Sequence, residues 1–220
     1  MKFVLKKDTQ VIAVVGPTAT GKSAYAVEIA KQLKAQGKKA AIISADSRQV
    51  YKFLNIGSGK VTEKEMGGIP HYMLDVVHPR TTFSVVAFVK KAEKIINELL
   101  TKNIVPIVCG GTGFYIDALL RGLTFPEVKP NKKLREKLEQ MSNEDLFKIL
   151  LKKDKERAEH IDAKNKVRLV RALEIIEELG KVPAMQTSKP KYQTQWIGLN
   201  TTDEILKQKI HAQKYDVGYV

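Results

Sequence analysis

The sequence of 220 residues contains little cysteine and no long apolar segment. Its one cysteine, Cys109, excludes a disulfide scaffold and a cysteine-rich metal site, and it favours a reducing, cytoplasmic location. The uninterrupted apolar runs are short, as in Val11–Val15, so we expect no membrane span and no membrane partner. The first ten residues also lack the apolar region of a secretory signal.

Acidic side chains are in the minority, with 24 Asp and Glu against 38 Lys and Arg, and the formal net charge is +14. The excess is spread along the chain, which has no basic tail, internal repeat or low-complexity segment. Such a charge indicates an anionic partner, with nucleic acid favoured over an anionic membrane surface. A solvated, lysine-rich surface would give the same composition, so charge alone does not decide the function.

Glycine is absent between Gly122 and Gly180, and this gap separates two kinds of sequence pattern. Before the gap, short β-branched runs alternate with helical spacing, which predicts an α/β fold with a mainly parallel sheet. Within the gap the pattern is almost entirely helical. We therefore predict an α/β core over 1–122, an all-helical insertion domain over 123–190, and a return to the core over 191–220.

The expected elements of the core follow from apolar periodicity and from helix signals. Ser84 can cap one helix, and Gly37 follows another as a stop signal. The expected strands cover residues 10–15, 39–44, 71–77, 104–109 and 194–200, and the expected helices cover 21–36, 84–102 and 114–120, with an incomplete final helix from 202.

Eight residues after the first expected strand fit the phosphate-binding pattern G-x-x-x-x-G-K-[ST] in full. They are Gly16, Pro17, Thr18, Ala19, Thr20, Gly21, Lys22 and Ser23. Glycines let backbone amides surround a phosphate chain, and the following helix directs its positive end at the same anion. Lys22 supplies a mobile charge, and the Ser23 hydroxyl can hold Mg²⁺ that bridges phosphate oxygens. The motif predicts a P-loop NTPase-like core that binds a polyphosphate or diphosphate.

Candidate polar residues follow two other strands, because open parallel sheets bind ligands at the carboxyl ends of their strands. Asp46 follows the second strand and can serve as a base, as a carboxylate near Mg²⁺, or as the cap of a short helix. Thr112, in the Gly110–Gly113 turn, can face a ligand or simply cap the next helix. Cys109 is expected in the core, and residues 57–60 are expected to form a loop rather than a second phosphate site.

Four segments, in their order and spacing, resemble the tRNA dimethylallyltransferase family, also called tRNA isopentenylpyrophosphate transferases. They are the P-loop, the D-S-x-Q-V-Y stretch at 46–51, the G-G-T-G turn at 110–113 and the R-L-x-R-A-L-E stretch at 168–174. The resemblance covers roughly residues 10–215, and the combination is far more specific than any one segment. Family members extend further at the C-terminus, so the chain resembles a short member.

The resemblance implies a mechanism. Family members transfer a dimethylallyl group from dimethylallyl diphosphate to the N6 amine of the adenosine just 3′ of the tRNA anticodon. By this resemblance the P-loop binds the diphosphate of the donor, and Lys22, Ser23 and Mg²⁺ stabilise the departing diphosphate. Asp46 accepts the proton of the adenine amine, and the adenine has to leave its stack to react.

Two groups of positions are implied to contact tRNA. The first group is Asp46, Ser47, Arg48, Gln49 and Thr112, and the second is Arg135, Val167, Arg168, Leu169, Val170 and Arg171. The spacing of Lys164, Arg168 and Arg171 favours one basic stripe on a helix, although a solvated helix face would give the same pattern.

Three alternatives stay open at this point: an enzyme that prenylates free adenine nucleotides, a P-loop kinase, and a chain that binds tRNA or diphosphate without turnover. The helical segment and the net charge argue against the first, and the D-S-x-Q-V-Y stretch argues against the second. We expect a monomer whose partners are the tRNA anticodon stem-loop and dimethylallyl diphosphate, with Mg²⁺ as cofactor.

Overall fold

The computed structural model describes residues 3–184, 186–202 and 204–208. The chain divides into two compact units. We call Met1–Leu123 together with Thr187–Val220 the core unit, and Thr124–Gln186 the helical unit. In the described part of the chain, no helix is both long and apolar enough to cross a membrane.

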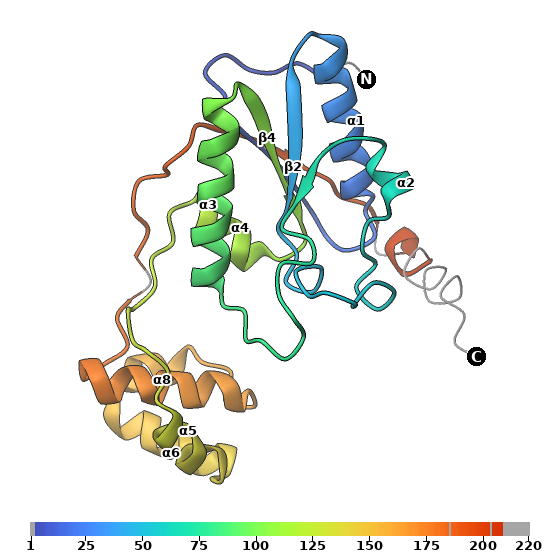
Figure 1. Ribbon diagram of the computed structural model, residues 1–220. Helices are drawn as coiled ribbons and strands as arrows, with labels where there is room; N and C mark the ends of the chain where they lie inside the picture. The colour runs from blue at the N-terminus through green and yellow to red at the C-terminus, as the bar shows by residue number, and fades with distance from the viewer. Residues whose placement is uncertain (1–2, 185, 203, 209–220) are drawn as a thin grey trace. The chain divides into compact units, whose positions relative to one another are not determined.

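The core unit is built on a parallel sheet of five strands in the order β3-β2-β4-β1-β5 (Figure 1). The strands are β1 (Val11–Val15), β2 (Lys39–Ser44), β3 (His71–Tyr72), β4 (Ile104–Gly110) and β5 (Thr194–Gly198). The internal strands β1, β2 and β4 are buried along most of their length, as strands covered by helices on both faces must be. The sheet confirms the predicted α/β fold.

Helices cover both faces of this sheet. They are α1 (Lys22–Ala35), α2 (Glu63–Met66), α3 (Val85–Thr101) and α4 (Gly113–Leu120). Figure 1 shows α3 and α4 on one face and α1 on the other. Successive residues of β1 alternate between two cores: Val11 and Ala13 pack on the α3 and α4 side, and Ile12 and Val14 pack on the α1 side. This double burial fixes β1 and therefore the position of the loop that follows it.

The third strand is shorter than the sequence predicts. The expected strand covers residues 71–77, but β3 ends at Tyr72. Left-handed backbone at Met73, with φ of 66°, and at Asp75, with φ of 54°, bends the chain away from β2. Val77 pairs instead with Tyr51 in an isolated parallel bridge. The prediction of one continuous strand is therefore wrong, and the bend brings residues near Val77 beside the segment after β2.

The helical unit has its own apolar core and clear helix boundaries. Its helices are α5 (Lys132–Glu139), α6 (Asn143–Lys153), α7 (Lys155–Glu159) and α8 (Lys166–Leu179). Each begins after a side chain that accepts a hydrogen bond from a first-turn amide, and these caps are Asn131, Ser142, Asp154 and Asn165. The apolar helix faces enclose Leu146, Leu150 and Leu169, which are fully buried. Local capping therefore sets where each helix starts, and the shared core holds the helices together.

Candidate diphosphate and nucleic-acid site

The P-loop connects the end of β1 to the start of α1, and two backbone positions define its shape. Gly16 has a φ of 151°, and a Cβ there would lie 2.2 Å from the carbonyl oxygen of Leu199. Gly21 has a φ of 84°, in the left-handed region that favours glycine. These positions turn the chain sharply into α1, whose first amides can receive an anion.

Lys22 is the charged side chain of this loop and is only 9% exposed. Its Nζ donates a hydrogen bond to the carbonyl oxygen of Pro17, within the loop itself. Burial lowers the pKa of Lys22, while the nearby Cys109 and Asp46 act in the opposite direction. A partly desolvated ammonium group beside backbone amides is well suited to bind phosphate oxygens.

The end of β4 approaches both the P-loop and the end of β2 at close range. A Cβ at Gly110 would lie 2.2 Å from the carbonyl oxygen of Ala45. A Cβ at Gly111 would lie 3.8 Å from both Lys22 Nζ and Thr18 Oγ1. Gly110 is needed for the first approach because any side chain would collide with backbone. The glycine-rich turn therefore joins three strand ends into one site.

Asp46 and Thr112 are linked through the turn that follows β2. Asp46 Oδ1 accepts hydrogen bonds from the backbone N–H of Arg48 at 2.8 Å and of Gln49 at 3.3 Å, so this carboxylate caps the turn. Thr112 Oγ1 accepts a hydrogen bond from the Ser47 N–H at 3.0 Å and makes no side-chain cap to α4. The interpretation of the Thr112 side chain as a plain helix cap is therefore wrong, because its hydroxyl fixes the Asp46 turn instead.

Cys109 lies at the end of β4 and is buried, as expected of a core residue. Burial raises the pKa of its thiol to about 12, although Lys22 and a hydrogen bond with Ser23 act in the opposite direction. The thiol therefore stays neutral at physiological pH and supports the start of α1 without adding charge.

A magnesium ion at Ser23 would find few protein ligands. Among the residues that the structure describes, no group of three or more His, Cys, Asp or Glu could hold a metal ion. Mg²⁺ commonly uses one or two protein groups and takes its other ligands from substrate phosphates and water. The Ser23 hydroxyl, with the Asp46 carboxylate close enough to influence the pKa of Lys22, fits that arrangement.

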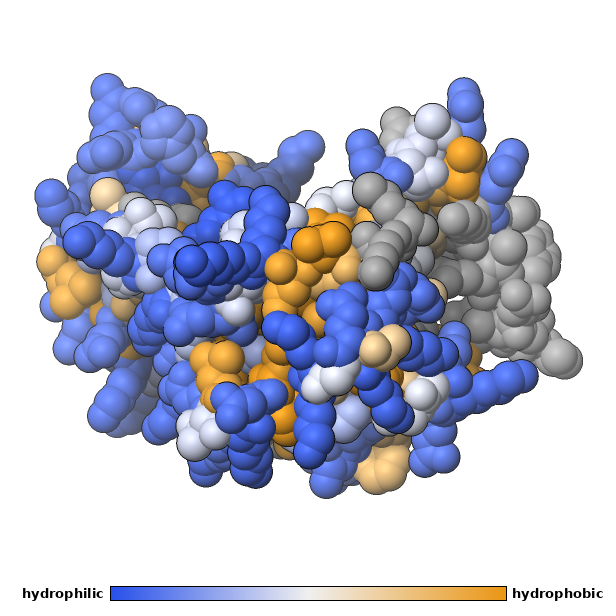
Figure 2. Space-filling model, turned by 90° about the horizontal axis from the view of Figure 1, so that it is seen from above, coloured by the Kyte–Doolittle hydropathy of each residue, from blue (hydrophilic) through white to orange (hydrophobic). Residues whose placement is uncertain are grey.

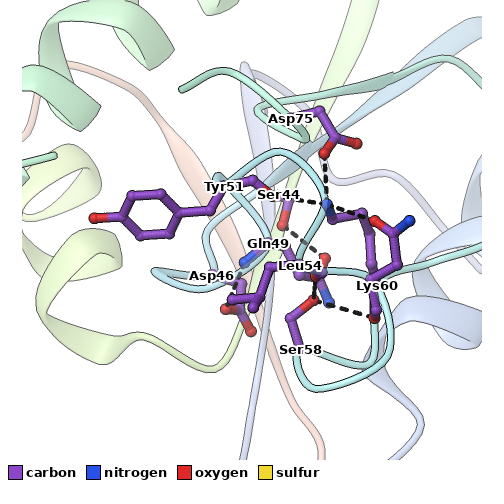
Figure 3. A network of polar contacts seen from close by, with 9 residues as sticks. Ser44, Asp46, Gln49, Tyr51, Leu54, Ser58, Lys60 and Asp75 are labelled. Carbon is purple, nitrogen blue, oxygen red and sulfur yellow. Dashed lines mark hydrogen bonds and ion pairs between the residues drawn. The ribbon is translucent and has the colours of Figure 1, made fainter. Parts of the chain in front are cut away.

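Gln49 ties the Asp46 turn to the sheet and to a following loop (Figure 3). Its Oε1 accepts a hydrogen bond from Ser44 Oγ at 3.2 Å, and its Nε2 donates one to the carbonyl oxygen of Gly59 at 3.1 Å. With both ends of its amide engaged, Gln49 holds the backbone on which Asp46 depends.

Lys60 is a structural residue of this region that sequence reasoning missed. Its side chain is 6% exposed, and its Nζ lies 2.5 Å from Asp75 Oδ1. The same Nζ donates to the Tyr51 carbonyl oxygen at 2.8 Å and to Asn55 Oδ1 at 3.0 Å (Figure 3). The segment 57–60 is a loop, as expected, but nothing in its sequence signals that the lysine is buried. All three ammonium protons have partners, so Lys60 is engaged within the protein.

Glu174 binds two arginines of the helical unit, Arg135 and Arg171. Its carboxylate is 1% exposed and receives Arg135 Nε and Nη2 at 2.7 Å each. Arg171 donates to the same carboxylate at 3.3 Å and to the Val128 carbonyl oxygen at 2.9 Å, and the Asn131 N–H also donates to Glu174. Burial alone would raise the pKa of Glu174, but the hydrogen bonds from Arg135 and Asn131 hold it below its usual range.

The remaining positions of the R-L-x-R segment differ in their exposure. Val167 and Arg168 are exposed, whereas Leu169 and Val170 are buried in the core of the helical unit. The side chains of Leu169 and Val170 therefore do not face solvent or an RNA partner. Lys164 precedes α8, so the interpretation of Lys164, Arg168 and Arg171 as one stripe of a single helix is also wrong.

The structure thus brings the sequence-predicted residues together in two places. In the core unit, the P-loop meets the turn from Asp46 to Gln49 and the Thr112 hydroxyl. In the helical unit, Arg135 and Arg171 share one buried carboxylate.

Comparison with known proteins gives a consistent result. A family model described as IPP transferase matches residues 49–215. The tRNA dimethylallyltransferase of Thermoanaerobacter sp. (strain X514) is 39% identical over 216 residues, which cover 93% of this chain and 67% of that protein. The protein of the same description from Pediococcus pentosaceus is 40% identical over 208 residues, covering 92% and 66%. The chain therefore spans about two thirds of the length of these relatives.

Two solved structures are similar in fold. The full-length tRNA isopentenylpyrophosphate transferase of Bacillus halodurans superposes with a TM-score of 0.63 at 32% identity, over 96% of this chain and 66% of its own. A eukaryotic dimethylallyltransferase acting on tRNA superposes with a TM-score of 0.77 at 26% identity, over 94% of this chain and 52% of its own.

Proposed function

Because the chain belongs to the IPP transferase family, we propose that it transfers a dimethylallyl group from dimethylallyl diphosphate to tRNA. The acceptor is the N6 amine of the adenosine 3′-adjacent to the anticodon, and diphosphate is released. The observation that carries the proposal is the meeting of a P-loop with the Asp46–Thr112 turn at the carboxyl ends of β1, β2 and β4. A P-loop alone fits any phosphate donor, whereas a fixed carboxylate beside it supplies a base.

The donor diphosphate binds in the P-loop, which comprises residues 16–23. Backbone amides of the loop and of the start of α1 surround the phosphate oxygens, and Lys22 adds a positive charge. These groups are aimed at the atoms on which negative charge accumulates when the bond to the allylic carbon breaks. The P-loop therefore activates the leaving group.

Asp46 acts on the acceptor. The N6 lone pair forms a bond to the allylic carbon while the carbon–oxygen bond breaks and its electron pair leaves with the diphosphate. The proton of the amine passes to Asp46, whose Oδ1 is already fixed by the Arg48 and Gln49 amides. Because an aromatic amine is a weak nucleophile, orientation by this fixed turn matters more than basicity.

Mg²⁺ belongs to the proposal as the cofactor. Ser23 would hold it, and the ion would neutralise charge on the diphosphate as it departs. Mg²⁺ typically keeps several waters and binds through one or two protein groups together with substrate phosphates, so Ser23 and the donor diphosphate would share the ion.

Both units contribute to tRNA binding in this proposal. The residues of the helical unit are Arg135, Val167, Arg168 and Arg171. The residues of the core unit are Ser47, Arg48, Gln49 and Thr112. The exposure of Arg168 and the net charge of +14 support an electrostatic contact with phosphates. We further expect a monomer that works in the cytoplasm, and light scattering during gel filtration tests the first of these expectations.

Transfer of radiolabelled dimethylallyl from its diphosphate to unmodified tRNA tests the function. The reaction is run with Mg²⁺ on tRNA that has adenosine after the anticodon, and in parallel on adenosine monophosphate and ATP. Label on tRNA, lost when that adenosine is replaced by guanosine, supports the proposal. Label on the free nucleotide would identify an adenylate prenyltransferase. Bound tRNA without label in any arm would identify a binding protein without turnover.

A further inference from the structure

Phe53 has a backbone conformation that is unusual for a bulky residue, and its side chain is exposed. Its φ is 65°, in the left-handed region that disfavours bulky side chains. Its side chain is nevertheless 78% exposed, so core packing gives no reason for the strained backbone. The face seen in Figure 2 is mostly hydrophilic, with apolar side chains gathered in small patches. Strain of this kind persists where the surrounding structure imposes it, and it often marks a functional position.

The structure around Phe53 holds the ring in place from both sides. Before it, Tyr51 pairs with Val77, and the Lys52 N–H donates to the Val77 carbonyl oxygen at 2.8 Å. After it, Ser58 Oγ donates to the Leu54 carbonyl oxygen. Lys60 then joins the two ends of the loop through Tyr51 and Asn55 (Figure 3). These hydrogen bonds fix the loop backbone on both sides of Phe53, so the ring is exposed on an ordered loop.

The His78 ring lies beside Phe53, and exposed apolar and cationic residues lie close to both in the sequence. The His78 ring lies edge-on to Phe53, with 6.1 Å between the ring centroids and an angle of 74° between the planes. Ile56, a few residues further on, is also exposed. Residues 47–59 and 76–82 contain the exposed Arg48, Lys52 and Arg80 and no acidic residue, whereas the nearby Lys60 is buried and paired with Asp75. An exposed aromatic ring within a cationic surface suits a nucleobase attached to phosphates better than an apolar peptide.

The position of Phe53 along the fold agrees with such a ligand. The segment carrying Phe53 continues the Asp46 turn, and both follow the carboxyl end of β2. The acceptor adenine must leave its stack to reach Asp46, and its neighbours in the anticodon loop then lose a stacking partner. An aromatic side chain at the rim can replace that partner for any base, since every base has a π-face.

We propose that Phe53, supported by His78, is a stacking platform for an unpaired RNA base next to the acceptor adenosine. This inference rests on the proposed function and adds to it a residue that stacks on a base after the acceptor adenosine has left its place in the anticodon loop. The left-handed backbone at Phe53 is maintained because it directs the ring outward, toward the substrate.

The test uses an anticodon stem-loop in which 2-aminopurine replaces the base on either side of the acceptor adenosine. Phe53→Gly removes the ring and also relieves the left-handed backbone. We expect the melting temperature to stay the same or rise, the affinity for the stem-loop to fall about tenfold, and 2-aminopurine quenching to be lost at one position. Phe53→Tyr keeps an aromatic face and should retain both affinity and quenching.

Asn103→Gly is the matched control. Asn103 also has a left-handed φ, of 54°, but it lies between α3 and β4, at the opposite ends of the strands from Asp46. This variant should bind the stem-loop as the wild type does. If Phe53→Gly bound the stem-loop with the same affinity and quenching as the wild type, the stacking platform would be overturned. The proposed function would still stand if the wild-type protein transferred dimethylallyl to tRNA. A parallel loss of melting temperature and affinity would overturn it as well, since Phe53 would then be a structural residue. Failure of the wild type to bind the stem-loop would overturn both proposals.

Discussion

The core unit and the helical unit hold their functional side chains by different means. In the core unit, glycines bring strand ends so close that backbone atoms determine the site, as at Gly110 beside Ala45. In the helical unit, the buried carboxylate of Glu174 gathers Arg135 and Arg171 from two helices. The arrangement in the core unit depends on glycines that lack a side chain, and the arrangement in the helical unit depends on charge.

This difference predicts how each region fails. A steric site is damaged by added volume and is insensitive to pH and salt. A charge-based site is damaged when one partner is neutralised, because the remaining charges lose their compensation. Four substitutions test the contrast, and they are ordered from the largest expected effect to the smallest.

Asp46→Asn should have the largest effect. The amide oxygen can still accept hydrogen bonds from the Arg48 and Gln49 amides, so the turn is kept while the base is lost. We expect the single-turnover rate of dimethylallyl transfer to fall about 10²- to 10⁴-fold with little change in tRNA affinity. Asp8→Asn, at an exposed turn, is the control. An unchanged rate would remove Asp46 from the role of base.

Gly110→Ala should damage the core unit through volume alone. The new Cβ would lie 2.2 Å from the Ala45 carbonyl oxygen, so backbone must move next to the Asp46 turn. We expect a loss of about 1–3 kcal/mol in the free energy of unfolding, measured by urea denaturation, and the loss should be the same at low and high salt. Gly113→Ala is the matched control because nothing lies within 4 Å of its Cβ position. Equal stability of the two variants would contradict the steric account.

Glu174→Gln should damage the helical unit through charge. It leaves two guanidinium groups around a neutral amide, and we expect a loss of about 1–2 kcal/mol at pH 7. Because folding lowers the pKa of Glu174, its stabilisation is complete above the ordinary value of 4.5 and is lost as pH falls through the lowered pKa. The stability difference from wild type should therefore shrink below pH 4.5.

Circular dichroism melts across this pH range measure the Glu174 effect. Glu177→Gln is the control, since Glu177 is more than half exposed and pairs with Lys153 at the surface. A difference that stays constant as the solution is acidified would show that the carboxylate charge does not stabilise the helical unit.

Arg168→Ala should give the smallest effect. Its exposed guanidinium can neutralise about one phosphate, so the slope of log affinity for tRNA against log salt should decrease by about 0.7–0.9. Val167→Ala, one residue earlier on the same helix, should leave the slope unchanged. Lys38→Ala, at the opposite end of β2 from Asp46, tests whether any lost charge has the same effect. If the slope of the Arg168→Ala variant equalled that of the wild type, Arg168 would not contact a tRNA phosphate.

Local signals explain what could be predicted from the sequence. The P-loop is a continuous segment between a strand and a helix, so its pattern and its context are both readable in the chain. The parallel sheet follows from apolar runs that alternate with helical spacing. These features depend on neighbours in sequence, and the structure confirms the α/β fold that they predict.

Long-range contacts explain what was missed. Arg135 meets Glu174 across 39 residues of chain, and Ser47 meets Thr112 across 65, so neither pair leaves a local pattern. Lys60 looks like any surface lysine until the bend at Asp75 brings a carboxylate to it. The same bend, set by left-handed residues that no sequence motif marks, shortened the third strand.

During synthesis the ribosome releases Gly16 long before Leu199, because the whole helical unit lies between them in the chain. The Leu199 N–H donates to the Val15 carbonyl oxygen at 2.8 Å, and the Leu199 carbonyl oxygen packs against Gly16. Until that segment has emerged, one edge of β1 has no partner strand and can pair with other chains. A nascent chain with a finished helical unit thus still has a P-loop that lacks its Leu199 contacts, and the loop is complete only after synthesis has passed Leu199.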